Sequence, residues 1–291
     1  MAANIAIIGG SRAYSLLQQG SLGNKIDTQV VTTPYGPSHP IHRYEFNGES
    51  FWFLSRHGEK GYELSAPFVN YRANIWALKE VGSKRIIAWS GPGIINQDYR
   101  VGYFALPHDL IDETRGRDYT FFEKKGIGFI RQREVFCPAL RTGLHQTLQQ
   151  LGLSFYPSGV YVCTQGPRLE TPAEIRKYRL LGADLVGMTL VPEAFLAKEL
   201  EMCYAPICYL TNYAEGVIDR PYEKGSLFEG MQTQEESEMV KSAVEAFPHI
   251  IHALVGYLTD KVWQCTCQEA MLRYKKQGTI GEDWHQWIAG I

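Results

Sequence analysis

Residues Gly159–Gly216 read GVYVCTQGPRLETPAEIRKYRLLGADLVGMTLVPEAFLAKELEMCYAPICYLTNYAEG. Three loops in this stretch each follow a short apolar or β-branched run: GPRLET (Gly166–Thr171), GMTLVPEA (Gly187–Ala194) and TNYAEG (Thr211–Gly216). The first two lead into segments that resemble helices, so the stretch alternates between strand, loop and helix. Because ligands of open α/β sheets bind outside the carboxyl ends of the strands, these loops are the first candidates for a functional site.

The composition is that of an ordinary globular protein. Of the 291 residues, 45% are hydrophobic and 21% are charged, and the net charge is −2. This charge does not favour a nucleic-acid partner, although a small anion needs only a few residues to bind. No stretch approaches the roughly 20 apolar residues of a membrane span, and the first residues lack the features of a signal peptide. We therefore expect a cytoplasmic enzyme with no membrane partner.

Six cysteines are present, and none forms a CxxC pair. Cys163, Cys203 and Cys208 lie in apolar runs and are expected to be buried thiols. Cys265 and Cys267 lie close together near the end of the chain, in a pattern that a metal site can also use. Because no histidine clusters with them, we expect two ordinary thiols and no metal site.

Small and basic residues follow several expected strands. The strand Asn4–Ile8 ends at Gly9-Gly10-Ser11, the strand Phe51–Ser55 at Arg56-His57-Gly58, and the strand Arg85–Ser90 at Ser90-Gly91-Pro92-Gly93. Glycines and hydroxyls suit close contact with an anion, and an arginine adds a permanent charge. Taken alone, GGS is more typical of a tight turn, and RHG of a surface arginine beside a core histidine. SGPG has an ordinary turn as its alternative. Neither GxGxxG nor GxxxxGK[ST] occurs at the first loop, which disfavours dinucleotide and nucleoside triphosphate ligands.

The alternation of apolar runs and turn residues along the rest of the chain predicts one mixed α/β domain over residues 1–258. Further strands are expected at Tyr103–Pro107, Gly159–Cys163, Asp184–Val186 and Cys203–Leu210. Helices are expected at Asn70–Val81, Cys137–Leu151, Thr171–Leu181, Pro192–Leu200 and, as one long helix, Glu235–Leu258. The charged and aromatic segment Glu113–Arg133 is expected to be an exposed excursion. Residues 259–291 are expected to form a helical extension that docks through Trp284 and Trp287.

Taken in order, a set of motifs resembles the purine nucleoside and methylthioadenosine phosphorylase family. These motifs are IIGGS, TPYGPS, RHG, VNYRANIWALK, PHDLIDETRGRDYTFF, CTQGPRLETPAEI, GMTLVPEAFLAKEL and TN. The resemblance spans Ile5 to Leu258, and its specificity comes from the order and spacing of the motifs. CTQGPRLET and the PHDLIDET run most resemble the bacterial methylthioinosine phosphorylase branch.

The resemblance implies a fold and a reaction. The family fold is a twisted mixed β-sheet flanked by helices, assembled as a homotrimer. The reaction is phosphorolysis, in which phosphate attacks C1′ of a purine nucleoside and releases the purine and a ribose 1-phosphate. No metal or organic cofactor is expected, since inorganic phosphate is a co-substrate. The segment Tyr119–Arg133 is the candidate arm that would reach a neighbouring subunit.

Carried over position by position, the resemblance also implies a site. The phosphate-binding residues would be Ser11, Arg56, His57, Ser90, Gly91 and Thr189. The ribose and the base would contact Met188, Leu169, Glu170, Asn212 and Ala214, with Glu170, Asn212 and His57 as the catalytic residues.

The two residues at the purine edge indicate which purine is used. The methylthioadenosine branch has a TDxD pattern where this chain has Thr211-Asn212-Tyr213-Ala214. A Glu170 carboxylate accepts the N1–H of a 6-oxopurine but repels adenine N1, which is itself an acceptor. The Asn212 amide can donate to O6 and interact with N7. We therefore expect a preference for 6-oxopurine nucleosides.

The 5′ group of the nucleoside depends on the segment after the TN strand. Relatives that use inosine or guanosine place a histidine there, whereas this chain has none between Tyr213 and Pro248. Leu227, Phe228 and Met231 are apolar candidates, and Phe129 from a neighbouring subunit would add a wall. An apolar pocket favours a thioether over a hydroxyl, so 5′-methylthioinosine is the expected substrate. The alternatives are a general inosine/guanosine phosphorylase, a methylthioadenosine phosphorylase, a nucleosidase and a non-catalytic nucleoside-binding protein.

Overall fold

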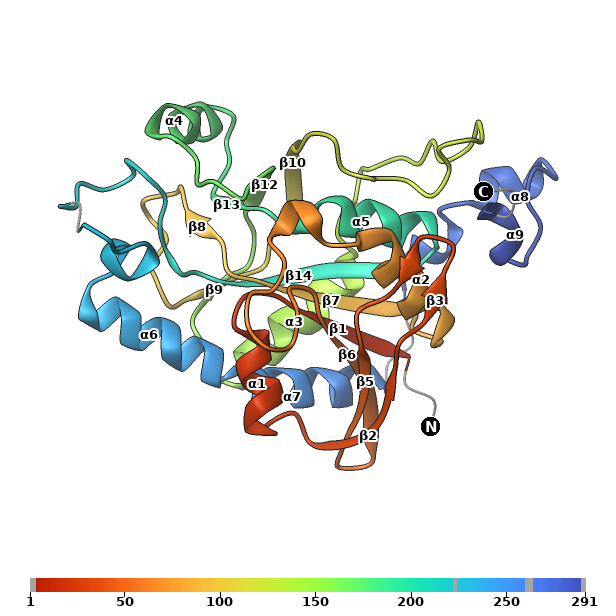
Figure 1. Ribbon diagram of the computed structural model, residues 1–291, viewed down its shortest axis with the longest axis horizontal. Helices are drawn as coiled ribbons and strands as arrows, with labels where there is room; N and C mark the ends of the chain where they lie inside the picture. The colour runs from red at the N-terminus through yellow and green to blue at the C-terminus, as the bar shows by residue number, and fades with distance from the viewer. Residues whose placement is uncertain (1–3, 222–223, 260–263, 289–291) are drawn as a thin grey trace.

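The computed structural model describes residues 4–221, 224–259 and 264–288, and Figure 1 shows a twisted sheet with helices on both faces. The strands of the main sheet are β1 (Ile5–Gly9), β2 (Asn24–Gln29), β5 (Ile41–Phe46), β6 (Glu49–Ser55), β7 (Arg85–Ser90), β9 (Phe104–Ala105), β11 (Phe155–Tyr156) and β14 (Cys203–Tyr209). Their order across the sheet is β11-β9-β14-β7-β1-β6-β5-β2. The expected mixed α/β architecture is confirmed.

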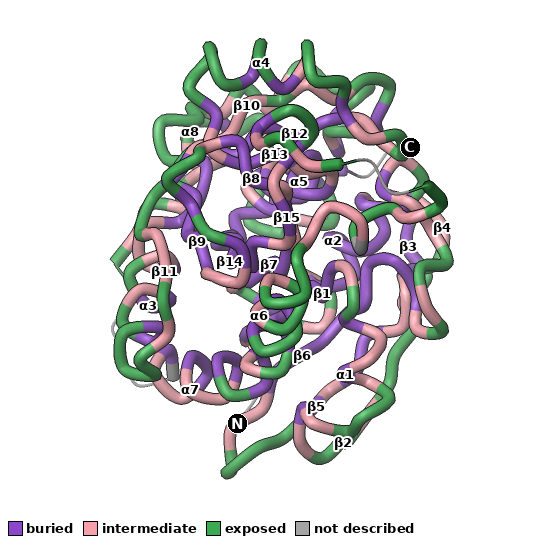
Figure 2. The backbone as a smooth tube through the Cα atoms, turned by 90° about the vertical axis from the view of Figure 1, so that its left-hand side faces the viewer, coloured by how far each residue is buried: buried purple, intermediate pink, exposed green. Residues whose placement is uncertain are grey.

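The central strands β14, β7, β1 and β6 run parallel to one another. Parallel strands are covered on both faces, which explains the near-continuous apolar runs IAIIG, RIIAWS and CYAPICY. Figure 2 shows these strands buried inside the molecule. Because their carboxyl ends lie at one edge, the loops that follow Gly9, Ser55, Ser90 and Tyr209 meet there.

A second sheet of five strands continues from two strands of the first. Its strands are β8 (Gly93–Ile94), β10 (Asp109–Glu113), β12 (Val160–Thr164), β13 (Leu185–Gly187) and β15 (Asn212–Tyr213), in the order β10-β12-β13-β8-β15. Only Gly91 and Pro92 separate β7 from β8, and only Leu210 and Thr211 separate β14 from β15. The second sheet therefore brings the loops after β12 and β13 to the edge where the loops of the first sheet meet. A separate short pair, β3 (Thr32–Thr33) and β4 (Gly36–Pro37), completes the strands of the described residues.

The helices are α1 (Ala13–Gln19), α2 (Tyr71–Glu80), α3 (Pro138–Gln150), α4 (Pro172–Leu180), α5 (Leu190–Glu199), α6 (Gln234–Glu245) and α7 (Phe247–Thr259). Helices α2 and α5 pack together on one face of the main sheet, and α3 and α7 pack together on the other (Figure 1). Helix α4 begins with a capping box, in which Thr171 and Glu174 satisfy each other's backbone N–H groups. The cap gives the preceding loop a fixed end, and that loop carries Glu170.

Residues 264–288 form three short helical turns, η3 (Cys267–Glu269), α8 (Leu272–Lys276) and α9 (His285–Ile288). The ring centroid of Trp284 lies 4.5 Å from that of Trp76 on α2. Trp287 is only 2% exposed. This segment therefore packs on the α2 side of the domain, beside the segment that precedes α3 (Figure 1).

Two expectations about the elements are wrong. The single helix expected at Glu235–Leu258 is two helices, α6 and α7, which meet at Ala246. Pro248 explains the break, because proline fits the first turn of a helix and disrupts its interior. The Glu113–Arg133 segment has neither helix nor strand beyond Glu113, but it is not fully exposed, since Phe121 and Phe122 are each only 3% accessible.

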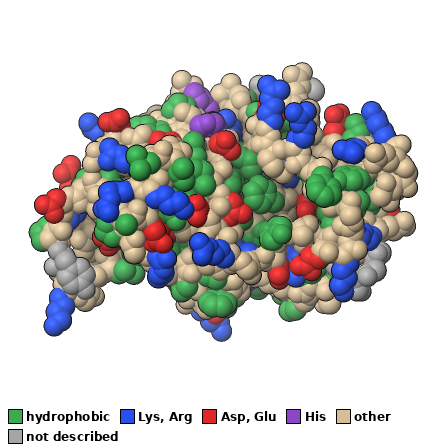
Figure 3. All heavy atoms as spheres, turned by 90° about the horizontal axis from the view of Figure 1, so that it is seen from above, with side chains coloured by type: hydrophobic (Ala, Val, Ile, Leu, Met, Phe, Trp, Pro, Cys, Tyr) green, Lys and Arg blue, Asp and Glu red, His purple; other side chains and the backbone are tan. Residues whose placement is uncertain are grey.

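The surface shows no large field of one charge on the face that carries α4. Figure 3 shows acidic and basic side chains interspersed over that face, which accords with the net charge of −2. None of the helices in the described part of the chain has the length and apolar content that a membrane span requires.

Candidate active site

A pocket of about 700 Å³, including the solvent space at its mouth, lies where the two sheets meet. Its lining residues are Ser11, Arg56, His57, Tyr62, Ser90, Gly91, Gly93, Leu169, Glu170, Val186, Gly187, Met188, Thr189, Asn212, Ala214, Glu215, Phe228 and Met231. The size suits a ligand as large as a nucleoside. The structure thus brings together in one pocket every residue expected to contact phosphate, ribose or base.

Glycine is required at two positions because aromatic side chains approach the backbone closely. A Cβ atom at Gly187 would lie 1.9 Å from the Tyr161 hydroxyl oxygen. A Cβ atom at Gly91 would lie 2.7 Å from the Tyr209 ring. The Tyr161 hydroxyl in turn lies 3.2 Å from the Ser90 hydroxyl, within hydrogen-bond distance. The glycines therefore allow buried tyrosines to support the loops around Ser90.

Arg56 is a fixed charge inside the protein. Its side chain is fully buried, and its Nε and Nη2 donate to the two carboxylate oxygens of Glu193 at 2.5 and 2.7 Å. Its Nη1 donates to the Trp89 carbonyl at 3.1 Å, and the Tyr204 hydroxyl donates to Glu193 at 2.7 Å. Burial disfavours the guanidinium charge, but the Glu193 carboxylate outweighs this effect and raises the pKa of Arg56. Arg56, expected as a phosphate-binding residue, is therefore also a fully buried core residue.

The guanidinium still has capacity for a ligand. Three of its five N–H groups are used by partners among the described residues. The other two remain for an anion in the pocket that Arg56 lines.

His57 is held as a neutral acceptor. Its Nδ1 lies 2.8 Å from the Leu64 carbonyl oxygen, so Nδ1 carries the hydrogen and donates it. Burial and the neighbouring Arg56 charge lower the pKa of His57 to about 3. The buried Nε2 has no hydrogen-bond partner among the described residues. At neutral pH this nitrogen can therefore accept a hydrogen bond from a hydroxyl group of a ligand.

Sequence reasoning missed Tyr62, which covers His57. The two rings stack with centroids 4.2 Å apart, and the Tyr62 hydroxyl lies beside the Ser11 side chain. Tyr62 lies in the segment GEKGYELSAP, which directly follows the RH of the RHG motif and contains no histidine. An aromatic residue in a loop carries no signal of its contacts, so only the structure could place Tyr62 in the pocket.

Glu170 and Asn212 form a polar pair in the same pocket. The Thr164 hydroxyl donates to the Glu170 carboxylate, and burial raises the pKa of Glu170 despite this bond. The Asn212 Oδ1 accepts from the Thr211 hydroxyl at 2.7 Å, and its Nδ2 donates to the Tyr213 carbonyl at 2.9 Å. These bonds orient the amide, and its Nδ2 also lies 3.7 Å from the Met231 sulfur, a weak acceptor that a ligand atom can replace.

Arg117 is a second residue that sequence reasoning missed. It belongs to the segment expected to be an exposed excursion, but it is only 7% exposed. Its guanidinium donates to four backbone carbonyls, those of Thr164, Gln165, Met188 and Val191, at 3.1, 2.7, 2.7 and 2.5 Å. Arg117 therefore fastens the strand end before Glu170 to the loop that contains Met188.

The four candidates for the 5′ subsite separate into two groups. Phe228 and Met231 line the pocket from the short helix η2 (Phe228–Met231). Leu227 is 54% exposed and is not among the residues that line the pocket, so its contact with the 5′ group stays a prediction. Phe129 is 81% exposed, and its backbone N–H donates to the Tyr274 hydroxyl at 2.9 Å. Its contact with a neighbouring subunit stays a prediction.

A group with the character of a metal site lies outside this pocket. Among the described residues, Cys137, Cys203, Cys265 and Cys267 have sulfur atoms within 4.8 Å of one another. The expectation of two ordinary thiols at Cys265 and Cys267 overlooked this group. The lack of a nearby histidine was a poor guide to a metal site, because the additional possible ligands are cysteines far away in the sequence.

With the geometry in place, the family can be assigned. The family described as the phosphorylase superfamily matches residues 4–255. The chain belongs to the phosphorylase superfamily. One similar member of the phosphorylase superfamily is the 6-oxopurine nucleoside phosphorylase of Pyrococcus furiosus. It is 41% identical over 274 residues, which cover 92% of this chain and 97% of the relative.

Two further members of the phosphorylase superfamily extend this comparison. The probable S-methyl-5′-thioinosine phosphorylase of Methanopyrus kandleri is 41% identical over 244 residues, covering 84% of this chain and 90% of that protein. The crystal structure of a methylthioadenosine phosphorylase from an antarctic soil metagenomic library matches with a TM-score of 0.82 at 30% identity. That match covers 92% of this chain and 91% of the other. The expected nucleoside phosphorylase fold is therefore confirmed.

Proposed function

We propose that this protein is a purine nucleoside phosphorylase that cleaves 6-oxopurine nucleosides with inorganic phosphate, and that 5′-methylthioinosine is its preferred substrate. The observation that carries the proposal is the composition of one pocket. It joins a buried cation and three hydroxyl groups to a carboxylate–amide pair. The names of the Pyrococcus and Methanopyrus relatives, which refer to 6-oxopurine nucleosides and methylthioinosine, support the same substrate class.

The cationic part of the pocket would hold the phosphate nucleophile. Arg56 supplies the charge, Ser11, Ser90 and Thr189 supply hydroxyl donors, and Gly91 supplies a backbone N–H. The transition state of such a reaction resembles an oxocarbenium ion, so an anion held next to C1′ both attacks it and stabilises its positive charge. A nucleosidase needs a positioned water in place of this anion. The buried charge of Arg56 suits an anion and is not needed to hold a water molecule, which favours a phosphorylase.

His57 would select the protonation state of the phosphate. Its neutral Nε2 can only accept a hydrogen bond, since Nδ1 donates to Leu64. A hydrogen phosphate ion has a hydroxyl group that can donate to this nitrogen, while its other oxygens accept from Arg56 and the hydroxyl donors. Tyr62, stacked over His57, would shield this bond from water.

The carboxylate–amide pair would bind the purine edge. An ionised Glu170 accepts the N1–H of a 6-oxopurine. The Asn212 Nδ2 donates to O6, or to N7 as the purine departs, in place of its weak contact with the Met231 sulfur. Adenine places an acceptor opposite Glu170 and a donor opposite Asn212. Each such mismatch of a buried polar group costs about 1–3 kcal/mol, which gives the preference for 6-oxopurines.

The 5′ substituent would lie against Phe228 and Met231. Both side chains are apolar and suit a methylthio group better than a hydroxyl, which would lose its hydrogen-bond partners there. Burying one methyl-sized group contributes only about 1–3 kcal/mol. The proposed preference for methylthioinosine over inosine is therefore at least about tenfold.

One substrate panel tests these proposals. Inosine, guanosine, adenosine, methylthioadenosine and methylthioinosine would each be incubated with the protein, with phosphate present or omitted. We expect release of purine and a sugar 1-phosphate only with phosphate, and the highest kcat/KM for methylthioinosine. Cleavage without phosphate would identify a nucleosidase, and binding without turnover a non-catalytic binding protein. Equal efficiency with inosine would leave a general 6-oxopurine nucleoside phosphorylase.

We further propose a homotrimer in which each Phe129 reaches the 5′ subsite of a neighbour. The segment around it exposes two large aromatic side chains, Tyr119 at 63% and Phe129 at 81%. Light scattering at assay concentrations should give the mass of three chains, and Phe129→Ala should lower kcat/KM for methylthioinosine. An active monomer would contradict the trimer.

A further inference from the structure

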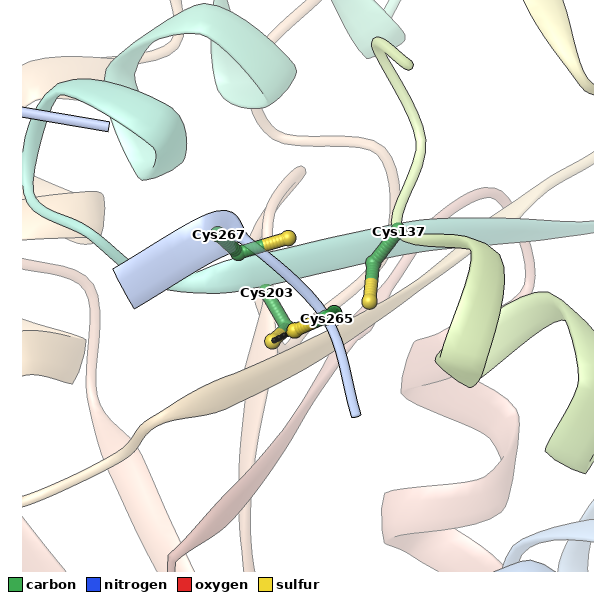
Figure 4. A group of neighbouring side chains, drawn as sticks. All are labelled: Cys137, Cys203, Cys265 and Cys267. Atoms are coloured by element: carbon green, nitrogen blue, oxygen red, sulfur yellow. Dashed lines mark hydrogen bonds between the residues drawn. The ribbon is translucent and has the colours of Figure 1, made fainter. Parts of the chain in front are cut away.

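Four cysteines from three distant parts of the chain meet outside the pocket. Cys137 is the N-cap residue of α3, and Cys203 is the first residue of β14. Cys265 and Cys267 come from the segment 264–288 that packs on the domain. Figure 4 shows the four side chains grouped around one small space, with Cys265 and Cys203 closest. The sulfur atoms of that closest pair are 3.4 Å apart.

The spacing of the sulfur atoms fits one metal ion. Zinc binds four thiolates tetrahedrally at about 2.3 Å, which places the sulfur atoms about 3.8 Å from one another. The four sulfur atoms here all lie within 4.8 Å of one another. Small movements of side chains would therefore complete a tetrahedron. We propose that Cys137, Cys203, Cys265 and Cys267 bind a structural zinc ion.

The ligand set restricts which metal ion can bind. Four thiolates in a tetrahedral arrangement select zinc or iron, and exclude calcium and magnesium, which prefer oxygen ligands. A closed site with four protein ligands has no open position for a substrate, so the role is structural.

The surroundings of the group suit thiolates. A zinc ion with four thiolates carries a charge of −2, and two cations, Arg85 and Lys198, lie near enough to interact with the sulfur atoms. Cys137 lies at the N-terminus of a 13-residue helix, where the helix dipole favours a negative charge. Zinc binding would release the thiol protons to solvent, and no oxidant is needed.

A pair of disulfides is the competing chemistry for the same residues. None of the six cysteines forms a disulfide bond in this structure, and the 3.4 Å between the Cys203 and Cys265 sulfur atoms exceeds the roughly 2 Å of such a bond. Disulfides would remove the thiolates that zinc needs. The two states therefore exclude each other, and a thiol count distinguishes them.

The zinc ion would fasten the segment 264–288 to the domain. Beyond the cysteines, this segment is attached through Glu201, whose carboxylate accepts from the Met271 N–H at 3.1 Å and from Lys275 at 2.7 Å. The same segment holds Phe129 through Tyr274, and its Trp287 carbonyl accepts from Lys125 at 2.5 Å. Loss of the zinc is expected to release this segment and, with it, the neighbouring part of residues 119–133.

The first test uses the unaltered full-length protein, purified anaerobically with a thiol reductant. Elemental analysis should find one zinc ion per chain after extensive dialysis against metal-free buffer. Denaturation in the presence of a chelator should then expose all six thiols to a thiol reagent. Protein with two disulfides would expose two thiols and contain no zinc, which would overturn the proposal. Protein with six free thiols that takes up neither zinc nor cobalt(II) would also overturn it.

The second test compares matched variants. Cys265→Ser/Cys267→Ser should lose its bound zinc and the visible absorption of a tetrahedral cobalt–thiolate centre when cobalt(II) is added. Cys208→Ser is the control, since Cys208 is fully buried on β14 but does not belong to the group. The control should keep one zinc ion per chain. Limited proteolysis should remove the terminal segment faster from the double variant. Retention of zinc by the double variant would refute the assignment of these ligands.

Discussion

Replacing Arg56 should damage both the stability of the protein and its use of phosphate. Arg56→Ala leaves the Glu193 carboxylate, which is 2% exposed, with the Tyr204 hydroxyl as its remaining side-chain donor. Removing one partner of a buried ion pair costs about 3–5 kcal/mol, because the other charge stays buried and unpaired. The free energy of unfolding should therefore fall by about that amount.

The expected loss of phosphate use follows from the two N–H groups that Arg56 retains for a ligand. Each hydrogen bond between charged groups contributes about 1.5–3 kcal/mol. Two of them correspond to a decrease of roughly 10²–10⁴-fold in kcat/KM for phosphate. Initial rates over a range of phosphate concentrations, at a fixed concentration of methylthioinosine, measure this decrease directly.

A double variant separates the two roles. Arg56→Met with Glu193→Gln removes both charges, so it avoids the unpaired carboxylate and should regain most of the lost stability. It should not regain phosphate use, because the guanidinium is still absent. Denaturation would be followed at one fixed protein concentration, since dissociation of the proposed trimer would contribute to apparent stability. Wild-type stability of Arg56→Ala would refute the structural role, and wild-type phosphate dependence of either variant would refute the binding role.

Three further predictions concern the other residues of the pocket. The pKa of His57 falls from about 6.5 in the unfolded chain to about 3 in the folded protein, so the unfolded chain binds more protons below pH 6.5. The stability that neutral His57 provides is complete above pH 6.5 and is lost as pH falls towards 3, at about 1.4 kcal/mol per pH unit. His57→Gln should show a shallower acid slope in denaturation experiments, and equal slopes would contradict this. Because burial raises the pKa of Glu170, its ionised form is lost on acidification. The ratio of kcat/KM for inosine to that for adenosine should therefore fall as pH falls, and Glu170→Gln should make it low and independent of pH. Met231→His should shift the preference from methylthioinosine towards inosine by about tenfold, and an unchanged ratio would place the 5′ group elsewhere.

The location of the site could be predicted because the carboxyl ends of the parallel strands lie at one edge of the sheet. Taken alone, the motifs at Ser11, Arg56 and Ser90 each have an ordinary structural explanation, which is the stronger one for the first two. Their strands are parallel and adjacent in the sheet, so three weak signals meet at one edge. Apolar runs identify such strands well, because burial on both faces requires them.

The supporting residues could not be predicted, because their partners are distant in sequence. Glu193 lies 137 positions from Arg56, and nothing in VPEA indicates an ion pair. Arg117 lies in a segment whose charges suggested exposure, yet it binds backbone carbonyls, which leave no pattern in the sequence. The break between α6 and α7 differs from these cases. Proline disrupts the interior of a helix, so Pro248 in the sequence is enough to predict the break.

Strand β14 links the cysteine group to the pocket. Its first residue is Cys203, and Asn212 follows its last residue, Tyr209, after a two-residue connection. Its register with β7 pairs Cys203 with Arg85 at one end and Cys208 with Ser90 at the other. A shift of this register by one residue would turn every side chain to the opposite face. A metal ion that fixes Cys203 therefore also helps to fix where β14 delivers Asn212, beside the strand end that carries Ser90. The proposed zinc ion lies outside the pocket, but the strand that it would hold helps to position Asn212 and Ser90, the residues proposed to bind the purine and the phosphate.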